Sequence, residues 1–115
     1  MGLIMKRGEI FLATLDPTRG SEIRKTRPVI IVSNDAANRA AALVTVVPLT
    51  SNISIVHPFE VKLGARETGL SKDSKAMAQQ VRTIDRTRLG ALRKGMVPAP
   101  RMRQVDDALR LHLDL

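Results

Sequence analysis

The segment from Asp16 to Pro28 holds the densest group of side chains in this chain that could do chemistry. Its thirteen positions contain four cations and two carboxylates, namely Arg19, Arg24, Lys25, Arg27, Asp16 and Glu22. A guanidinium group presents a planar fork of donors that matches phosphate, so these side chains suit the binding of phosphate oxygens. A plain hairpin needs only about two to five connecting residues, and this longer, charged loop is therefore predicted to bind a ligand.

Two predicted strands hold the ends of this loop. Residues 9–15 are mostly apolar with β-branched and aromatic content, and residues 29–33 begin with the run Val29-Ile30-Ile31-Val32, which is typical of a buried strand. Pro17 and Gly20 supply turn chemistry inside the loop. The pattern therefore predicts a charged loop carried between two strands of one sheet.

The rest of the pattern predicts a mainly β chain with helices. We expect helical turns over 35–42, strands over 43–49, 59–63, 74–78 and 80–84, a loop over 64–72, a short helix over 85–92 and a longer helix over 100–113. Pro100 suits the first position of the last helix, whose apolar residues recur on one face. Five or six short strands with a terminal helix predict a small, twisted, partly closed β-barrel.

The composition describes one small basic domain over residues 1–115. The formal charge of +8 points to a polyanionic partner, and nucleic acid, anionic lipid and an acidic protein all remain candidates. Cysteine is absent, so disulfides and thiolate metal sites are excluded. No apolar run approaches the about 20 residues that span a bilayer, and we expect a cytoplasmic protein without membrane attachment. The small core of such a chain favours a homodimer.

Several short motifs follow one another along the chain. They are Lys6-Arg7-Gly8-Glu9-Ile10, Asp16-Pro17, Gly20-Ser21-Glu22, Thr26-Arg27-Pro28, Ser33-Asn34-Asp35, Pro48-Leu49-Thr50-Ser51, Pro58-Phe59-Glu60-Val61 and Arg82-Thr83-Ile84-Asp85. In this order they resemble the MazF/PemK/Kid family of toxin endoribonucleases. The resemblance implies an SH3-like barrel of the CcdB/PemK type with a C-terminal α-helix. It also implies a type II toxin that forms a homodimer, cuts single-stranded mRNA at short sequence motifs independently of the ribosome and without a metal or cofactor, and is inhibited by an acidic, MazE-like antitoxin.

The resemblance assigns roles to individual residues. The family's catalytic arginine falls on Arg27, its catalytic threonine on Thr50, and the glutamate often implicated in activity on Glu22. Cleavage without metal requires the 2′-hydroxyl to attack the adjacent phosphorus, which leaves 2′,3′-cyclic phosphate and 5′-hydroxyl ends. We expect Arg27 to stabilise the growing charge, Thr50 to donate a hydrogen bond to a phosphate oxygen and Glu22 to act as the base; a role for Arg27 as general acid stays open. RNA contacts are expected from Arg19, Ser21, Arg24, Lys25, Ser51, Asn52, Gln79 and Arg82.

One position departs from some members of the family. Kid and others use a carboxylate just before the segment that matches Arg82-Thr83-Ile84-Asp85, whereas the corresponding residue here is Gln79. A glutamine cannot act as a general base, so a mechanism that relies on that carboxylate is not expected. The two histidines, His57 and His112, lie outside the matched motifs and are interpreted as a loop residue and a helix-face residue.

Two other functions are compatible with a basic barrel. A non-catalytic nucleic-acid-binding barrel would explain the charge and the loop but does not require Arg27 and Thr50 in their motif contexts. A toxin of the CcdB type, which poisons DNA gyrase without cutting nucleic acid, would act largely through the C-terminal helix. The arginines of that helix, Arg101, Arg103 and Arg110, are interpreted as a solvated face.

Overall fold

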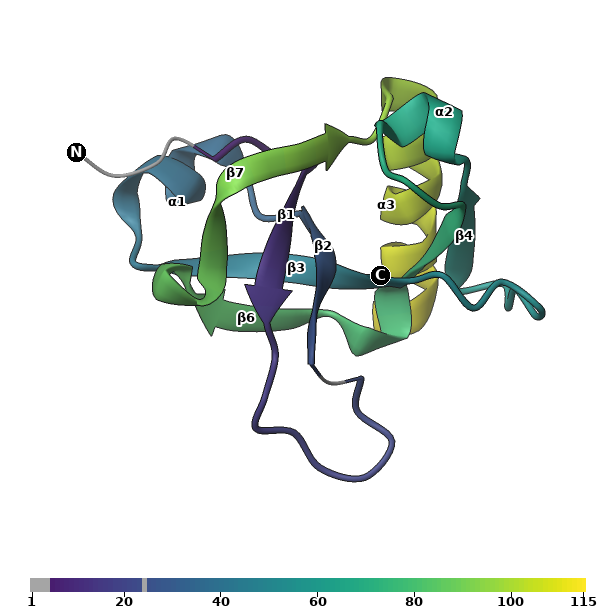
Figure 1. The fold of residues 1–115 in the computed structure, drawn as a ribbon, viewed down its shortest axis with the longest axis horizontal. Helices are drawn as coiled ribbons and strands as arrows, with labels where there is room; N and C mark the ends of the chain where they lie inside the picture. The colour runs from purple at the N-terminus through teal and green to yellow at the C-terminus, as the bar shows by residue number, and fades with distance from the viewer. Residues whose placement is uncertain (1–4, 24) are drawn as a thin grey trace.

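The structure is a computed structural model that describes residues 5–23 and 25–115. Its strands are β1 (Glu9–Thr14), β2 (Thr26–Ile31), β3 (Leu43–Thr50), β4 (Glu60–Leu63), β5 (Ser74–Met77), β6 (Arg82–Asp85) and β7 (Leu89–Met96). Its helices are α1 (Asp35–Ala40), α2 (Ala65–Thr68) and α3 (Ala99–Leu113), with two 3-10 turns, η1 (Ala78–Gln80) and η2 (Arg86–Arg88). Figure 1 shows the loop between β1 and β2 extending away from the body of the molecule.

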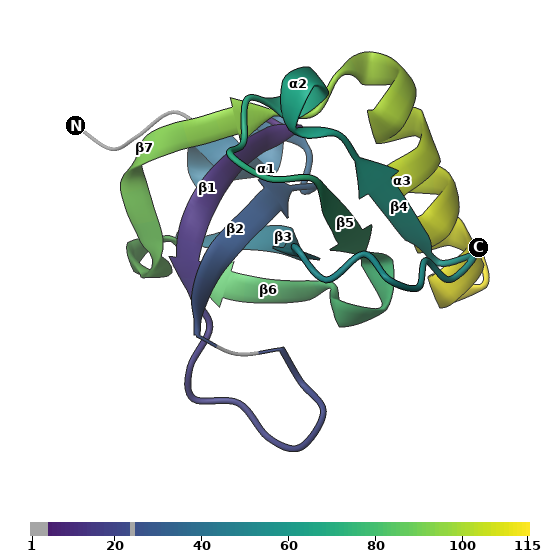
Figure 2. The same cartoon turned by 45° about the vertical axis from the view of Figure 1, so that its right-hand side comes forward.

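The strands form one antiparallel sheet in the order β4-β5-β3-β2-β1-β7, with β6 pairing with β3. Strand β3 connects the parts of the sheet because it pairs with β6 along its first half, with β2 near its middle and with β5 at its end. Figure 2 shows β1 and β2 crossing in front of β3 and β6, so the sheet curls strongly. Its two ends, β4 and β7, do not pair with each other within the described residues, which leaves the curled sheet open.

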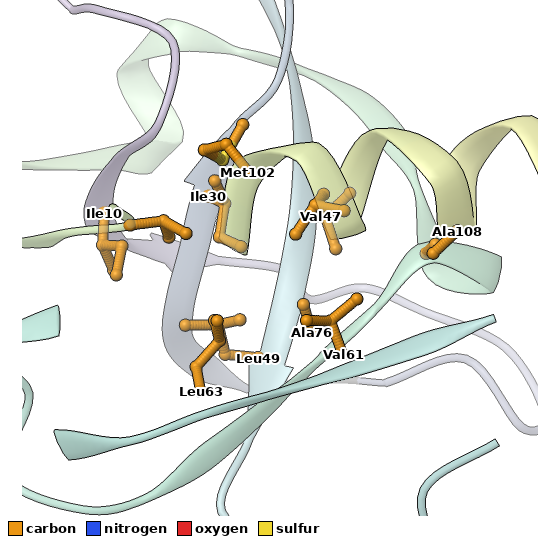
Figure 3. Close-up of a cluster of buried hydrophobic side chains, with 12 residues drawn as sticks. Ile10, Ile30, Val47, Leu49, Val61, Leu63, Ala76, Met102 and Ala108 are labelled. Atoms are coloured by element: carbon orange, nitrogen blue, oxygen red, sulfur yellow. The ribbon is translucent and has the colours of Figure 1, made fainter. Parts of the chain in front are cut away.

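Two clusters of buried side chains lie on opposite faces of β2. Ile30 belongs to the cluster that packs under α3, where Met102, Val105 and Ala108 cover the sheet (Figure 3). Val29 and Ile31 belong to the second cluster, with Phe11 and Val46 among its members. A strand that is buried on both faces needs apolar residues at successive positions, which explains the uninterrupted Val29-Ile30-Ile31 run. This double burial holds the end of the β1–β2 loop on a rigid strand.

The predicted mainly β chain with a C-terminal helix is confirmed, and most element boundaries agree within about three residues. The prediction of a short helix over 85–92 is wrong. Only Arg86–Arg88 form a helical turn, capped by the Asp85 side chain, which accepts a hydrogen bond of 2.9 Å from the Thr87 backbone nitrogen. Residues 89–96 instead pair with the outer edge of β1. Gly90 and Gly95 disfavour a helix over 89–96. Pairing of β7 with β1 provides hydrogen-bond partners for the backbone groups of both strands.

The segment expected as a loop over 64–72 contains the single helical turn α2. The Glu67 side chain accepts a hydrogen bond of 2.8 Å from the Gly64 backbone nitrogen, and Gly69, with a φ of 84°, ends the turn. A glycine tolerates this left-handed conformation without the steric cost of a Cβ atom. Helix α2 then packs beside β7, where the Cα of Gly95 leaves room for the carbonyl group of Thr68.

Candidate functional site

A pocket of about 350 Å³ opens where β2 begins and β3 ends. The segment 70–74, which leads into β5, closes its other side. Two residues that the sequence singled out, Arg27 and Thr50, both line it. Its full lining is Thr26, Arg27, Pro28, Leu49, Thr50, Ser51, Leu70, Ser71, Lys72 and Ser74. The pocket therefore brings together a guanidinium, an ammonium group and several hydroxyls, all of which can bind phosphate oxygens.

The sheet register explains why Arg27 and Thr50 meet. Val29 of β2 pairs with Pro48 of β3, and continuing this antiparallel register by two residues brings Arg27 opposite Thr50. Both side chains are half-buried. The Arg27 Nη1 atom donates a long hydrogen bond of 3.5 Å to the Leu49 carbonyl oxygen. Two buried strands thus fix the relative position of the two candidate catalytic residues.

The polar residues after β3 lie at the mouth of this pocket. Ser51 is exposed and contributes to its lining. The Thr50 Oγ1 atom accepts a hydrogen bond of 3.2 Å from the Asn52 backbone nitrogen. The Asn52 side chain turns to its own loop, where its Oδ1 atom accepts a hydrogen bond of 2.9 Å from the Ser54 hydroxyl. The sequence-predicted Ser51 and Asn52 are therefore next to Thr50, on a loop that continues to residue 59.

Glu22 lies elsewhere. Its Oε1 atom accepts a hydrogen bond of 2.6 Å from the Arg19 backbone nitrogen, which closes a local turn in the loop. Glu22 lines a second pocket, which lies between the loop and β6. Arg82, Asp85 and Arg88 line the same pocket. The structure therefore does not bring Glu22 together with Arg27 and Thr50.

The other predicted RNA-binding residues of the loop are exposed where the structure describes them. Arg19 and Ser21 are exposed, and Arg24 lies outside the described residues. Lys25 is exposed and has a positive φ of 71°, and its backbone nitrogen donates a hydrogen bond of 3.2 Å to the Asp16 side chain. Arg19, Ser21 and Lys25 do not line the pocket of Arg27.

Arg82 fastens the same loop to the sheet. Its Nη1 atom donates a hydrogen bond of 3.3 Å to the Ile23 carbonyl oxygen, and its Nη2 atom donates one of 2.8 Å to the Gln80 side chain. The Gln80 amide also donates a hydrogen bond of 3.4 Å to the Ser21 carbonyl oxygen. Arg82 is thus a partner of the loop backbone in this structure.

Gln79 belongs to a buried polar network. Its Nε2 atom donates a hydrogen bond of 2.8 Å to Glu60 Oε2, while its own Oε1 atom is buried and accepts no hydrogen bond from the described residues. Lys75 Nζ donates one of 2.9 Å to Glu60 Oε1. Burial raises the pKa of Glu60, but the hydrogen bonds from the His57 backbone, Gln79 and Lys75 outweigh it, so that this pKa lies below its ordinary value. Glu60 is therefore ionised at neutral pH.

Sequence reasoning missed the side of the pocket formed by Leu70, Ser71, Lys72 and Ser74. These residues were assigned to a loop and a strand without a role. The one sequence signal for this side of the pocket is Lys72, a cation between a glycine-containing loop and a predicted strand. Its position at the pocket depends on β5 pairing with the end of β3, which local patterns do not reveal.

Across residues 5–23 and 25–115, no group of three or more histidine, aspartate or glutamate side chains is placed to hold a metal ion. No helix in the described part of the chain is long and apolar enough to cross a membrane.

Comparisons with known proteins show the family to which the chain belongs and proteins with the same fold. Residues 6–113 match the model of the PemK-like, MazF-like toxins of type II toxin–antitoxin systems. Endoribonuclease MazF9 of Mycobacterium tuberculosis is 52% identical over 118 aligned positions, which cover 97% of this chain and 98% of that protein. The crystal structure of MazF from Deinococcus radiodurans superposes with a TM-score of 0.86 at 27% identity and covers 99% of this chain and 100% of that one.

A mycobacterial endoribonuclease solved in complex with its cognate antitoxin is also similar. Its TM-score is 0.78 at 27% identity, with 96% of each chain covered. The family model and the curated relative each span nearly all of this chain, including the strands that carry Arg27 and Thr50. The chain belongs to the family of PemK-like, MazF-like toxins of type II toxin–antitoxin systems.

Proposed function

We propose that this chain is an endoribonuclease that cuts single-stranded mRNA at short sequence motifs, with Arg27 and Thr50 as catalytic residues. The observation that carries the proposal is the shared pocket, in which the sheet register sets the two residues opposite each other. The 52% identical relative, which bears the name of an endoribonuclease, supports the same activity. A cytoplasmic location follows from the mRNA substrate.

The proposed reaction is attack of the RNA 2′-hydroxyl on the adjacent phosphorus. The oxygen–phosphorus bond to the 5′-oxygen then breaks, and the leaving 5′-oxygen takes up a proton from water, which gives a 2′,3′-cyclic phosphate and a 5′-hydroxyl. Arg27 supplies a permanent positive charge for the phosphorane oxygens, and the Thr50 hydroxyl donates a hydrogen bond to one of them. Glu22 is the candidate base only on the condition that the loop 16–25 moves over the bound strand, because in this structure Glu22 lines the neighbouring pocket.

The remaining proposed RNA contacts come from several segments of the chain. Ser51 and Asn52 follow Thr50, while Arg19, Ser21, Arg24 and Lys25 belong to the charged loop. Lys72 is added to this set because it lines the pocket. Gln79 can make its proposed RNA contact only if its side chain leaves the hydrogen bond with Glu60, because its Oε1 atom is buried in this structure. Arg82 contributes mainly by holding the loop backbone.

Digestion of a long single-stranded RNA by the purified protein in excess EDTA tests this function. We expect cleavage at a recurring short motif and fragments that polynucleotide kinase labels directly because they carry 5′-hydroxyl ends. Activity that disappears with the chelator and returns with magnesium would exclude the proposed mechanism. RNA binding without any cleavage would favour the non-catalytic barrel, and inhibition of DNA gyrase without cleavage would favour a toxin of the CcdB type.

We further propose a homodimer and an acidic antitoxin as its protein partners. The mycobacterial relative was solved with its cognate antitoxin, and the charge of +8 suits an acidic chain as well as RNA. Both ligands are expected near Lys25 and Arg27, so they should exclude one another. The test is a titration of the Arg27→Ala variant with fluorescent RNA and added antitoxin. A stable ternary complex with undiminished RNA affinity would overturn competition, and a monomer in ultracentrifugation would overturn the dimer.

A further inference from the structure

We infer that the buried pair of Lys75 and Glu60 positions the loop 51–59, which carries the RNA-contacting residues next to Thr50. The inference rests on the proposed function and deepens it, because it identifies two positioning residues for the same site. It concerns two residues, Lys75 and Glu60, that do not line the pocket of Arg27.

The loop leaves β3 at Thr50 and returns to the sheet at Glu60, the first residue of β4. Strand β5 lies between these two strands, and its residue Lys75 pairs in register with Thr50 on one side and with Lys62 on the other. In Figure 1 the loop projects beyond β4, away from the rest of the sheet. Lys75 is therefore at the base of the loop, next to the residue from which the loop starts.

The polar contacts of the pair are directed at the loop backbone. Lys75 Nζ donates a hydrogen bond of 2.7 Å to the Ile55 carbonyl oxygen and one of 2.9 Å to Glu60 Oε1. The same Glu60 oxygen accepts a hydrogen bond of 3.0 Å from the His57 backbone nitrogen. The side chains of Lys75 and Glu60 are only 11% and 2% exposed. The two charges thus hold the middle of the loop at Ile55 and its returning part at His57.

The loop has few apolar contacts that could replace this anchor. Ile55 and Val56 are 62% and 42% exposed, so their side chains contribute little burial. His57 stacks on Phe59 with ring centroids 5.1 Å apart, but this is a contact within the loop itself. The hydrogen bonds to Lys75 and Glu60 therefore hold the middle of the loop against the sheet, while its last residue is held by the 3.3 Å hydrogen bond that the Phe59 carbonyl oxygen accepts from the Ala78 backbone nitrogen.

A buried ion pair is a poor way to stabilise a fold. The cost of removing two charges from water offsets most of their attraction, and well-packed apolar residues of similar volume often stabilise a protein as well or better. The pair is thus better explained by the position that it gives the loop than by the stability that it gives the sheet. Apolar replacement separates the two roles, because it can keep the packing while it removes the hydrogen bonds to Ile55 and His57.

The test compares the wild-type protein with the double variant Lys75→Met, Glu60→Met. Lys62→Met is the matched control, since it removes an exposed lysine that is the register neighbour of Lys75 on β4. Hydrogen exchange of the amides in 53–59 is followed by mass spectrometry, with global unfolding by urea as the reference. RNA cleavage kinetics are measured for all three proteins.

We expect the double variant to unfold at a urea midpoint close to that of the wild type. Its loop amides should exchange at least tenfold faster, and KM for RNA should rise about tenfold with a smaller change in kcat. The control should retain the exchange pattern and KM. Should the double variant not fold, Lys75→Gln replaces it, because its shorter side chain cannot keep both hydrogen bonds.

Unchanged exchange in the loop would overturn the inference, and so would faster exchange with an unchanged KM. If the wild-type protein cuts no RNA, the proposed function fails independently of the loop measurement. The dissociation constant for fluorescent single-stranded RNA then takes the place of KM, and equal affinity of wild type and double variant would overturn the positioning role.

Discussion

The Arg27 guanidinium donates a hydrogen bond of 3.5 Å to the carbonyl oxygen of Leu49, the residue before Thr50. This contact spans β2 and β3 and holds the guanidinium at the pocket that Thr50 also lines. Both groups are therefore in place before RNA binds. Such preorganised donors lower a barrier more than donors that must reorganise during the reaction.

The hydroxyl of Thr50, and not its bulk, should matter for cleavage. Thr50→Val keeps the size of the side chain but removes the donor, and we expect single-turnover cleavage to slow about a hundredfold. Thr50→Ser keeps the hydroxyl and should stay within a few-fold of the wild type. Equal rates for the valine variant and the wild type would remove Thr50 from the catalytic set.

Much of the site was predictable because its signals are local. The motifs that resemble the family single out Arg27 and Thr50, and the apolar runs after Pro28 and before Thr50 predict the two strands that carry them. The same resemblance groups Glu22 with them, yet its turn with Arg19 directs it to another pocket. The sequence of a long loop does not show in which direction its side chains point.

Features that depend on long-range pairing were not predictable from local patterns. Residues 89–96 have glycines and no clear alternation, and they form a strand because β1 has an edge that they can pair with. Lys75 was assigned to a short strand without a role, since its partners Ile55 and Glu60 are 20 and 15 residues away. Such contacts follow from the sheet order, which periodicity does not specify.

Gly95 on β7 should be intolerant of any side chain. A Cβ atom there would lie 2.3 Å from the Thr68 carbonyl oxygen, so α2 or β7 would have to shift. We expect Gly95→Ala to lower the free energy of unfolding by about 1–3 kcal/mol in urea titrations. Gly90→Ala on the same strand is the control, because its Cβ would meet the Leu12 carbonyl oxygen at an ordinary 3.7 Å. Equal stability of the two variants would contradict the close contact.

Acid should weaken the Glu60 network. Burial raises the pKa of Glu60, but the hydrogen bonds from His57, Gln79 and Lys75 bring it below its ordinary value of 4.5. The folded carboxylate thus binds its proton less tightly than the unfolded one, so its contribution to stability is complete above pH 4.5 and is lost as the pH falls towards the lowered pKa.

The measurement is the urea midpoint between pH 7 and pH 3 for the wild type and the variant Lys75→Met, Glu60→Met. Glu67 and Asp85, whose pKa values are also lowered by hydrogen bonds, are present in both proteins and cancel in the difference. The wild type should lose stability relative to the variant in the acid range. Two curves that stay parallel throughout would show that Glu60 does not contribute in this way.

The most direct test of the account is single-turnover cleavage of a single-stranded RNA by the Arg27→Ala variant. The alanine removes the positive charge from the pocket but leaves the core clusters intact, so fold and dimer should be unchanged. We predict a loss of about a thousandfold or more in the cleavage rate, with fluorescent RNA still bound. Arg103→Ala, which removes an exposed arginine of α3, should cleave like the wild type. Near-wild-type cleavage by Arg27→Ala would contradict the catalytic role of this pocket.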